Sequence, residues 1–360
     1  MSGTHGPDGP DRRRPRAQAA GGDASERLVH HMTARVLIVI PTLNEAAHIG
    51  GVLDTLLPFA ERHGARIVVA DGGSTDGTRA LVTARPEPGI VLLDNPRRLQ
   101  SAAINLAVER FGDEADWLIR IDAHSAYPAD YCDVLLAEAQ ATGADSVVVG
   151  MKAVGSGFWQ SLIAAAQNSR IGNGGSAHRV MPVGKFVDHG HHALMRIAAF
   201  REVGGYDESF SHNEDAELDL RLRSAGFRIW LTPRTRVTYF PRRSLGALVK
   251  QYFAFGKGRA RNILKHRSRP GLRQAVLVAL TPALLLALLA PLHWIFALPL
   301  AGWVAGCLAG GVMIARETGS PGGLLSGFAA GAMHVAWSAG FWVQLGRHLM
   351  QGRPGTGATA

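Results

Sequence analysis

Two side chains that can bind a metal ion, Asp122 and His124, follow the stretch Trp117-Leu-Ile-Arg-Ile, which predicts a short buried strand. Because residues two apart on a strand point to the same side, we expect both to face one site. In open α/β sheets, ligands bind outside the carboxyl ends of the strands. A carboxylate and a neutral imidazole suit Mg²⁺ or Mn²⁺, with phosphate oxygens and water completing the shell. The alternative is an Asp that caps a turn beside a surface His.

Other carboxylates follow predicted strands or begin a predicted helix. Glu45 and Asp71 stand where the first two strands end, and there they can hydrogen-bond a base or a ribose. Glu214 and Asp215 lie near the start of a helix, and a helix N-terminus stabilises a carboxylate anion. Each of these acids can equally be a helix cap, so the carboxylates alone leave the function open.

The elements that position these residues alternate along the chain. Apolar runs predict strands at 34–40, 66–70, 90–93 and 117–122, and helical spacing predicts helices at 46–61 and 101–110. Less regular patterns predict strands at 147–149, 227–232 and 236–240, and helices at 158–167 and 245–255. This order indicates an α/β fold with a mostly parallel sheet and helices on both faces. The loops lack the glycine patterns of dinucleotide-binding and P-loop proteins.

Composition narrows the class of protein. The length of 360 residues allows one large α/β domain plus a smaller part. The net charge is +9, and many arginines lie between 234 and 273, beside a very apolar segment. We interpret them as facing phosphate ligands or an anionic membrane, and we expect no nucleic acid partner, because no aromatic-basic recognition module is present. The two cysteines permit no disulfide framework, which fits a reduced, cytoplasmic catalytic part.

Histidines gather in the second half of the predicted domain. The sequence Asp188-His189-Gly190-His191-His192 follows a Gly-rich, basic stretch at 168–187, which includes His178 and Arg179 and reads as a loop over a site or a surface loop. A metal site at the histidines is one interpretation. No carboxylate or cysteine spacing completes it, so we favour packing and substrate contacts.

The C-terminal part predicts a membrane domain. The runs 275–292, 294–315 and 324–346 contain almost no charge, and each approaches the roughly 20 residues that cross a bilayer. Arginines and lysines before Ala275 place that side in the cytoplasm. We therefore expect a disordered tail at 1–33, a catalytic domain at 34–270, about three transmembrane helices at 271–348 and a flexible tail at 349–360.

Four short segments in this order resemble the inverting family-2 glycosyltransferases with the GT-A fold. They are Pro41-Thr42-Leu43-Asn44-Glu45, Asp71-Gly72-Gly73-Ser74-Thr75-Asp76-Gly77-Thr78, Asp122-Ala123-His124 and Glu214-Asp215. The segments 241–252 and 256–259, followed by apolar helices, look like the succinoglycan-biosynthesis glucosyltransferase subgroup. The resemblance implies a mixed, mostly parallel GT-A sheet.

The resemblance also implies roles for residues. It places the turn at Pro41 and Thr42, with Glu45, Asp71 and Asp76, around the nucleotide, usually uridine. Asp122 and His124 stand where the family has its D-x-D motif, which binds ribose and a diphosphate-bound metal, with His124 replacing the second acid. Asp215 matches the catalytic base, and Glu214 and Arg259 complete the expected substrate-binding set. The Q-x-x-R-W motif of processive members is absent, which favours addition of one sugar per encounter.

The sequence thus predicts a multi-pass plasma-membrane enzyme with a cytoplasmic catalytic domain. It would transfer a hexose from a UDP-sugar to a hydroxyl of a lipid-linked saccharide, in exopolysaccharide or cell-envelope glycan synthesis, with Mg²⁺ or Mn²⁺. One alternative is a polyprenyl-phosphate sugar synthase, whose phosphate acceptor scarcely needs a base. Another is a non-catalytic membrane subunit that keeps the fold.

Overall fold

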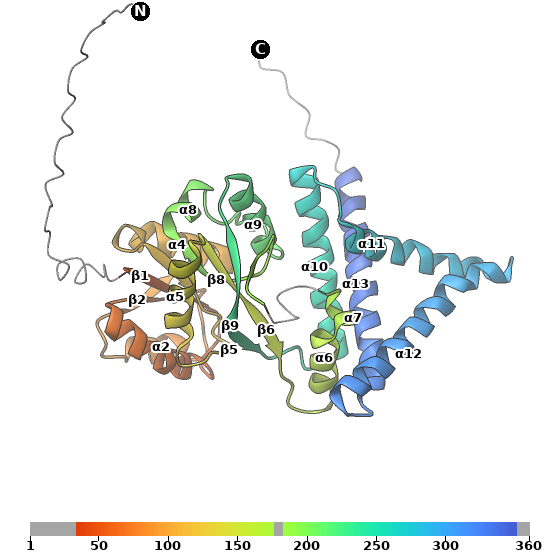
Figure 1. The fold of residues 1–360 in the computed structure, drawn as a ribbon, viewed down its shortest axis with the longest axis horizontal. Coiled ribbons are helices and arrows are strands. Elements are labelled where there is room, and N and C mark those ends of the chain that lie inside the picture. Colours follow the sequence, from red (N-terminus) through yellow and green to blue (C-terminus); the bar gives the residue numbers. More distant parts are fainter. Residues whose placement is uncertain (1–33, 176–182, 351–360) are drawn as a thin grey trace, which may run out of the picture. The chain divides into compact units, whose positions relative to one another are not determined.

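The computed structural model describes residues 34–175 and 183–350 (Figure 1). The predicted tail at 1–33, most of the predicted tail at 349–360, and His178 and Arg179 of the Gly-rich loop lie outside the described residues. Leu349 and Met350, assigned to the C-terminal tail, belong to the last helix.

The described strands form one nine-stranded sheet with the order β3-β2-β1-β4-β8-β6-β9-β5, and β7 pairs with β9. The strands are β1 Val36–Thr42, β2 Arg66–Asp71, β3 Ile90–Asp94, β4 Trp117–Arg120, β5 Ser125–Ala126, β6 Ser146–Ala153, β7 Lys185–Phe186, β8 His191–Arg196 and β9 Ile229–Tyr239. β1 to β4 pair in parallel, whereas β8 runs antiparallel to both of its neighbours. The sheet is therefore mixed, as predicted.

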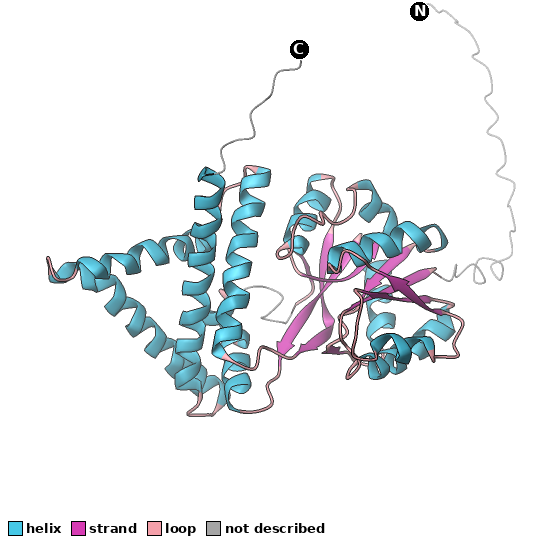
Figure 2. Ribbon diagram, turned by 180° about the vertical axis from the view of Figure 1, so that it is seen from behind, coloured by secondary structure: helices cyan, strands magenta, loops and turns pink. Residues whose placement is uncertain are grey.

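Helices cover both faces of this sheet (Figure 2). They are α2 Ile49–His63, α3 Thr78–Thr83, α4 Gln100–Phe111, α5 Tyr131–Thr142, α6 Phe158–Asn168, α7 Arg170–Asn173, α8 Ile197–Glu202, α9 Glu214–Ser224, α10 Leu245–His266, α11 Leu272–Leu285, α12 Leu298–Thr318 and α13 Gly323–Met350, with 3₁₀ turns at Gly112–Glu114, Leu286–Leu289 and Trp294–Ala297. Successive residues of β1 enter opposite cores: Ile38 packs with residues of α2 and α5, and Val39 with residues of α4 and α9.

Two boundaries differ from the prediction. The strands expected at 227–232 and 236–240 are one strand, β9, whose pairing with β6 is interrupted between Val149 and Gly150, where β9 skips from Thr232 to Arg236. α10 does not end at Phe255 but continues through two glycines to His266. Gly256 lies so close to the carbonyl of Trp337 in α13 that a Cβ there would collide with it. These glycines therefore permit helix packing rather than break the helix.

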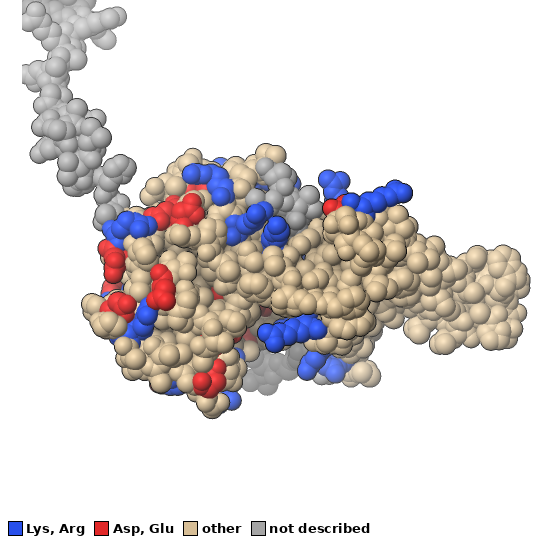
Figure 3. Space-filling view, turned by 90° about the horizontal axis from the view of Figure 1, so that it is seen from below, with Lys and Arg blue, Asp and Glu red and all other residues tan. Residues whose placement is uncertain are grey.

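Two stretches within the described part of the chain are long and apolar enough to cross a membrane, namely Leu272–Leu289 and Trp294–Thr318. They form a helical hairpin whose large apolar side chains, including Leu288, Leu292 and Trp294, are exposed. On the face in Figure 3, charged side chains gather over the sheet and α10, whereas the surface of the hairpin carries none over most of its length.

The third expected span corresponds to α13, which packs against α10 and α6 (Figure 2). Ile163, Leu248 and Met333 are fully buried in the cluster between these helices. Burying side chains of this size contributes about 1.5–3 kcal/mol each. Contacts thus cross the boundary predicted at residue 270, and α13 packs on the helices that precede that boundary.

Candidate active site

Two loops that follow neighbouring strands interlock at the carboxyl edge of the sheet. β1 and β2 are parallel and place Thr42 beside Asp71, so both loops leave the same edge. Asn44 Oδ1 accepts a hydrogen bond from the Thr75 N–H (2.9 Å), and the Asn44 N–H donates to Ser74 Oγ (2.8 Å). Asn44 has a φ of 58°, a left-handed conformation that Asn adopts more readily than most residues. The two loops therefore form one surface.

The acids of the second loop bind their own loop. Asp71 is fully buried and accepts hydrogen bonds from the Ser74 N–H (2.9 Å), Ser74 Oγ (2.5 Å) and Arg79 Nη1 (3.0 Å). Burial opposes its ionisation, but these donors lower the pKa of Asp71 below its ordinary value. Asp76 accepts from the N–H (3.1 Å) and Oγ1 (2.6 Å) of Thr78. Both acids thus order the loop, and their contact with a nucleotide stays a prediction.

A buried arginine joins the acid after β4 to the acid on α9. The side chain of Arg120, 5% exposed, places Nη1 2.6 Å from Oδ1 of Asp215 and Nη2 3.5 Å from Oδ1 of Asp122. Gln100 Nε2 donates to the same Asp122 oxygen (2.8 Å), and His191 Nε2 lies 3.5 Å from the other. Burial raises the pKa of Asp122, but Arg120 and His191 outweigh that effect and lower it overall. Asp122 is therefore held as an anion.

The carboxylates of the Glu214–Asp215 pair have opposite environments. Asp215 Oδ1 also accepts from the hydroxyl of Tyr206 (2.9 Å), and although burial opposes ionisation, Arg120 holds the pKa of Asp215 well below its usual range. Glu214 Oε2 is buried and has no hydrogen-bond partner among the described residues. Burial and the charge of Asp215 raise the pKa of Glu214. Both residues lie in the first turn of α9, where the helix N-terminus favours the anion. At Glu214, burial and the charge of Asp215 act against this effect.

His124 does not share a strand face with Asp122, because β4 ends at Arg120 and both residues lie in the loop that follows. The expected geometry of alternation is therefore wrong. His124 is 56% exposed, and its Nδ1 lies 3.0 Å from Oε1 of Glu45. Among the described residues no group of three His, Cys, Asp or Glu side chains is arranged to hold a metal ion.

Two histidines of the 188–192 segment, His189 and His192, form a second cluster around one aspartate. His189 Nδ1 lies 2.5 Å and His192 Nε2 2.8 Å from the carboxylate of Asp219, which is almost fully buried in α9. Asp219 and, more weakly, Asp215 raise the pKa of His192 despite its burial. The predicted substrate-binding residue Arg259 lies in α10 near Asp219, and burial lowers the pKa of its guanidinium. The packing interpretation of these histidines thus fits their carboxylate contacts.

A cavity of about 320 Å³ opens beside His124. Its lining includes His48, which precedes α2, Thr55 of α2, and Tyr127 and Phe240. This cavity adjoins the loop after β4 and the start of α2, so it lies next to the site that the sequence predicted.

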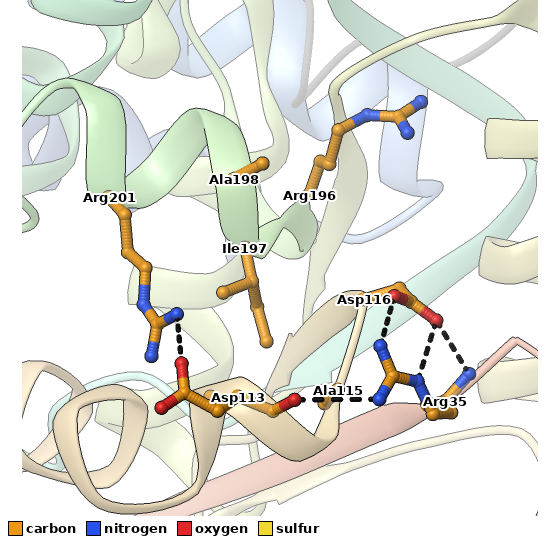
Figure 4. Close-up of a pocket in the computed structure, with 9 residues that line it drawn as sticks. Arg35, Asp113, Ala115, Asp116, Arg196, Ile197, Ala198 and Arg201 are labelled. Atoms are coloured by element: carbon orange, nitrogen blue, oxygen red, sulfur yellow. Dashed lines mark hydrogen bonds and ion pairs between the residues drawn. The ribbon is translucent and has the colours of Figure 1, made fainter.

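A second cavity, of about 310 Å³, lies at the opposite end of β4 (Figure 4). Two ion pairs form within its lining, Arg35 with Asp116 (2.8 Å) and Arg201 with Asp113 (2.6 Å), whereas Arg196 pairs with Asp145 outside it (3.3 Å). Because it is at the amino end of the strand, it is separate from the predicted site.

The structure therefore brings together most of the residues that the sequence singled out. Glu45 and His124 touch, and Arg120 connects Asp122 with Asp215. The sequence interpretation missed Arg120, although a charged residue inside an apolar strand needs a buried partner and so signals one. Tyr206 and Gln100 carried no such signal, since their partners come from distant segments.

The interlocked loops after β1 and β2, the acid after β4 and the carboxylate pair on α9 supply hydrogen-bonding and anionic groups of the kinds that a transferase uses. An open, mixed α/β sheet with these groups at its carboxyl edge is the arrangement of a nucleotide-sugar transferase with the GT-A fold.

The family model described as "Glycosyl transferase family 2" matches residues 37–204. The chain is 55% identical over 311 residues to the succinoglycan biosynthesis protein ExoA of Rhizobium meliloti (strain 1021), an alignment covering 86% of this chain and 94% of that protein. The chain therefore belongs to glycosyltransferase family 2, as predicted, and is a glycosyltransferase.

Two further similarities are more distant. The N-acetylglucosaminyl-diphospho-decaprenol L-rhamnosyltransferase of Mycobacterium tuberculosis (strain ATCC 25618 / H37Rv) is 27% identical over 251 residues, covering 60% of this chain and 79% of that protein. The mannosyltransferase PcManGT from Pyrobaculum calidifontis, solved in complex with GDP-Man and Mn²⁺, has a TM-score of 0.53 and 21% identity, covering 86% of this chain and 87% of that one. The latter similarity supports the GT-A fold.

Proposed function

We propose that this enzyme transfers a hexose, with inversion, from a UDP-sugar to a hydroxyl of a lipid-linked saccharide in the synthesis of an exopolysaccharide or another cell-envelope glycan. The observation that carries the proposal is the side chain of Arg120, which joins Asp122 on the donor side to Asp215 on α9. A single displacement needs its donor and its base on opposite sides of one carbon, and this bridge fixes the two carboxylates relative to each other. The relative named as a succinoglycan biosynthesis protein supports the polysaccharide context.

The donor binds, in this proposal, at the carboxyl edge of β1 and β2. Pro41 and Thr42 from one loop and Asp71 and Asp76 from the other surround the uridine, whereas Glu45, expected there from the sequence, contacts His124 (3.0 Å). Because hydrogen bonds between the loops already order this surface, nucleotide binding need not pay to order it.

Two side chains after β4, Asp122 and His124, could bind a divalent cation, Mg²⁺ or Mn²⁺, but they do not complete its coordination shell. Asp122 offers an anionic carboxylate and His124 an exposed imidazole, and two protein ligands leave positions for phosphate oxygens and water. When bound, the cation would stabilise negative charge on the departing diphosphate.

Asp215 is the proposed base. The acceptor hydroxyl oxygen forms a bond to the anomeric carbon as the bond from that carbon to the UDP oxygen breaks. The hydroxyl proton passes to the Asp215 carboxylate, and the bonding pair leaves with UDP. Arg120 and the Tyr206 hydroxyl hold the Asp215 carboxylate in place, and Glu214 contacts acceptor hydroxyls. A positioned base contributes roughly 10²–10⁴ in rate.

The acceptor approaches, we propose, from the side of α10. There Arg259 forms no ion pair with a carboxylate of the described residues and can meet a phosphate of the lipid carrier. The apolar hairpin 272–318 anchors the enzyme in the plasma membrane as part of a membrane domain at 271–348. The arginines that precede the hairpin favour a cytoplasmic catalytic domain, because basic residues are more frequent on the cytoplasmic side.

The test is label transfer in membranes that contain the full chain, supplied with radiolabelled UDP-hexoses and a lipid extract from cells that make the glycan. We expect label in a solvent-extractable lipid from which mild acid releases an oligosaccharide that carries the label. Release of the labelled hexose as a monosaccharide would favour the polyprenyl-phosphate alternative instead. A purified chain that binds no UDP would favour the non-catalytic subunit.

A further inference from the structure

We propose that Glu45 is a positioning residue for His124: its carboxylate holds Nδ1 of the imidazole, so that Nε2 faces outward as the metal ligand. The inference rests on the proposed metal-dependent transfer and deepens it. It changes the role of Glu45 from a nucleotide contact to a support for the metal site.

The contact joins two loops that are distant in sequence. Oε1 of Glu45 lies 3.0 Å from Nδ1 of His124. The Glu45 side chain is 15% exposed, whereas His124 is 56% exposed, so the carboxylate lies inside and the imidazole lies at the surface. The imidazole therefore has one nitrogen turned to the protein and the other available to a ligand.

Glu45 is itself held by its neighbours. Its N–H donates to Thr78 Oγ1 (2.8 Å), and that hydroxyl donates to Oδ1 of Asp76 (2.6 Å). The other oxygen of Asp76 accepts from the N–H of Ala46 (3.0 Å). The backbone at Glu45 is thus fixed on both sides of the residue, and Asp76 acts on His124 through this chain of contacts.

The chemistry of the pair decides the tautomer. An ionised carboxylate can only accept hydrogen bonds, so the Nδ1 that faces Glu45 must carry the proton. In a neutral imidazole the lone pair then lies on Nε2, which is the nitrogen that points away from Glu45. A carboxylate on the far nitrogen of a ligating imidazole also fixes the ring and raises its basicity.

This arrangement explains how an imidazole can stand where a second carboxylate is expected. His124 lacks the negative charge of a second carboxylate. The carboxylate of Glu45, which contacts His124, partly restores that charge. Because imidazole suits Mn²⁺ better than Mg²⁺, which prefers oxygen ligands, the pair should favour Mn²⁺.

The test is Mn²⁺ binding to the full chain in detergent with saturating UDP, followed by the electron paramagnetic resonance of free Mn²⁺. We expect Glu45→Ala to weaken Mn²⁺ binding about 10–100-fold, the usual cost of removing a group that supports a metal ligand. His124→Ala should weaken it at least as much, because it removes the ligand itself. The double variant should bind no more weakly than His124→Ala, because Glu45 acts only through His124. Glu61→Ala, which removes an exposed acid from the far end of α2, should match the wild type.

UDP affinity measured in EDTA tests whether Glu45 contacts the nucleotide rather than the metal ligand. It also shows whether each variant is folded, because an unfolded chain would not bind UDP. We expect Glu45→Ala to keep the wild-type UDP affinity without metal. Mn²⁺ binding by Glu45→Ala equal to wild type, or losses that multiply in the double variant, would overturn the proposal, as would a loss of metal-free UDP affinity. Failure of the wild type to bind UDP at all would instead overturn the proposed function.

Discussion

Nη1 of Arg120 lies 2.6 Å from Oδ1 of Asp215, and both side chains are largely buried. Arg120 comes from the strand that precedes the donor-side acid, and Asp215 from the helix that we assign to the acceptor side. Removing one partner of a buried ion pair typically costs 3–5 kcal/mol, because the other charge is left uncompensated. Loss of either partner should therefore destabilise the fold, and the pair fixes the distance between the two halves of the site.

The first prediction concerns the base. Asp215→Asn keeps the size of the side chain but cannot accept the acceptor proton, so we expect kcat to fall at least ~10²-fold while the Kd for UDP stays nearly unchanged. Steady-state kinetics and UDP titration measure the two quantities. Because Asn leaves Arg120 without its counter-charge, the thermal midpoint must be measured on the same sample.

Glu214→Gln is the matched comparison for Asp215→Asn. Glu214 has no hydrogen-bond partner at Oε2 within the described ranges, and its raised pKa makes it the rival base. We expect Glu214→Gln to lower kcat less than Asp215→Asn does. A larger loss for Glu214→Gln would mean that the other member of the pair accepts the proton.

The second prediction concerns the metal. EDTA should abolish transfer and added Mn²⁺ should restore it, because Asp122 and His124 provide only two protein ligands and the charge on UDP must be stabilised. His124→Asp should retain more activity than His124→Ala, since Asp restores an oxygen ligand. Full activity of the wild type in EDTA would refute the metal requirement.

The third prediction concerns pH and the ion pair of His192 with Asp219. Asp219 and Asp215 raise the pKa of His192, although its burial and Arg120 act to lower it. The stabilisation is therefore complete below the ordinary imidazole pKa of about 6.5 and is lost as pH rises through the raised value. We expect the thermal midpoint to fall as pH rises above about 6.5. In Asp219→Asn the midpoint should start lower and depend less on pH; an unchanged slope would exclude this pair as the cause.

The fourth prediction concerns α13. A Cβ at Gly340 would collide with the carbonyl of Phe253 in α10, whereas Gly346 on the same helix has open space. We expect Gly340→Ala to destabilise the protein by about 1–3 kcal/mol, as overpacking does, and Gly346→Ala to be neutral or stabilising. Thermal unfolding in detergent checks both. Equal midpoints for the two variants would mean that α13 does not hold α10.

The sequence predicted the elements whose pattern is local. The apolar run before Asp122 and the helical spacing after Glu45 needed no distant partner to be recognised, and the structure contains both elements. The four short segments also predicted the family correctly: the first three stand at the ends of β1, β2 and β4, and the fourth begins α9.

Relationships between distant segments could not be predicted in the same way. Gly256 reads locally as a helix breaker, and only the approach of α13 explains why the helix continues through it. His124 reads as a strand-face partner of Asp122, but its contact is Glu45, 79 residues earlier. Such pairings depend on how the loops cross in space, which periodicity does not encode.

The proposed transfer is tested most directly by UDP release from membranes that contain either the full chain or its Asp215→Asn variant, with the lipid acceptor and a panel of UDP-sugars. We predict that one UDP-hexose gives metal-dependent, acceptor-dependent UDP release by the wild type, reduced at least ~10²-fold in the variant. Release that is equal in both, or absent with every UDP-sugar, would contradict the proposed donor and the role of Asp215.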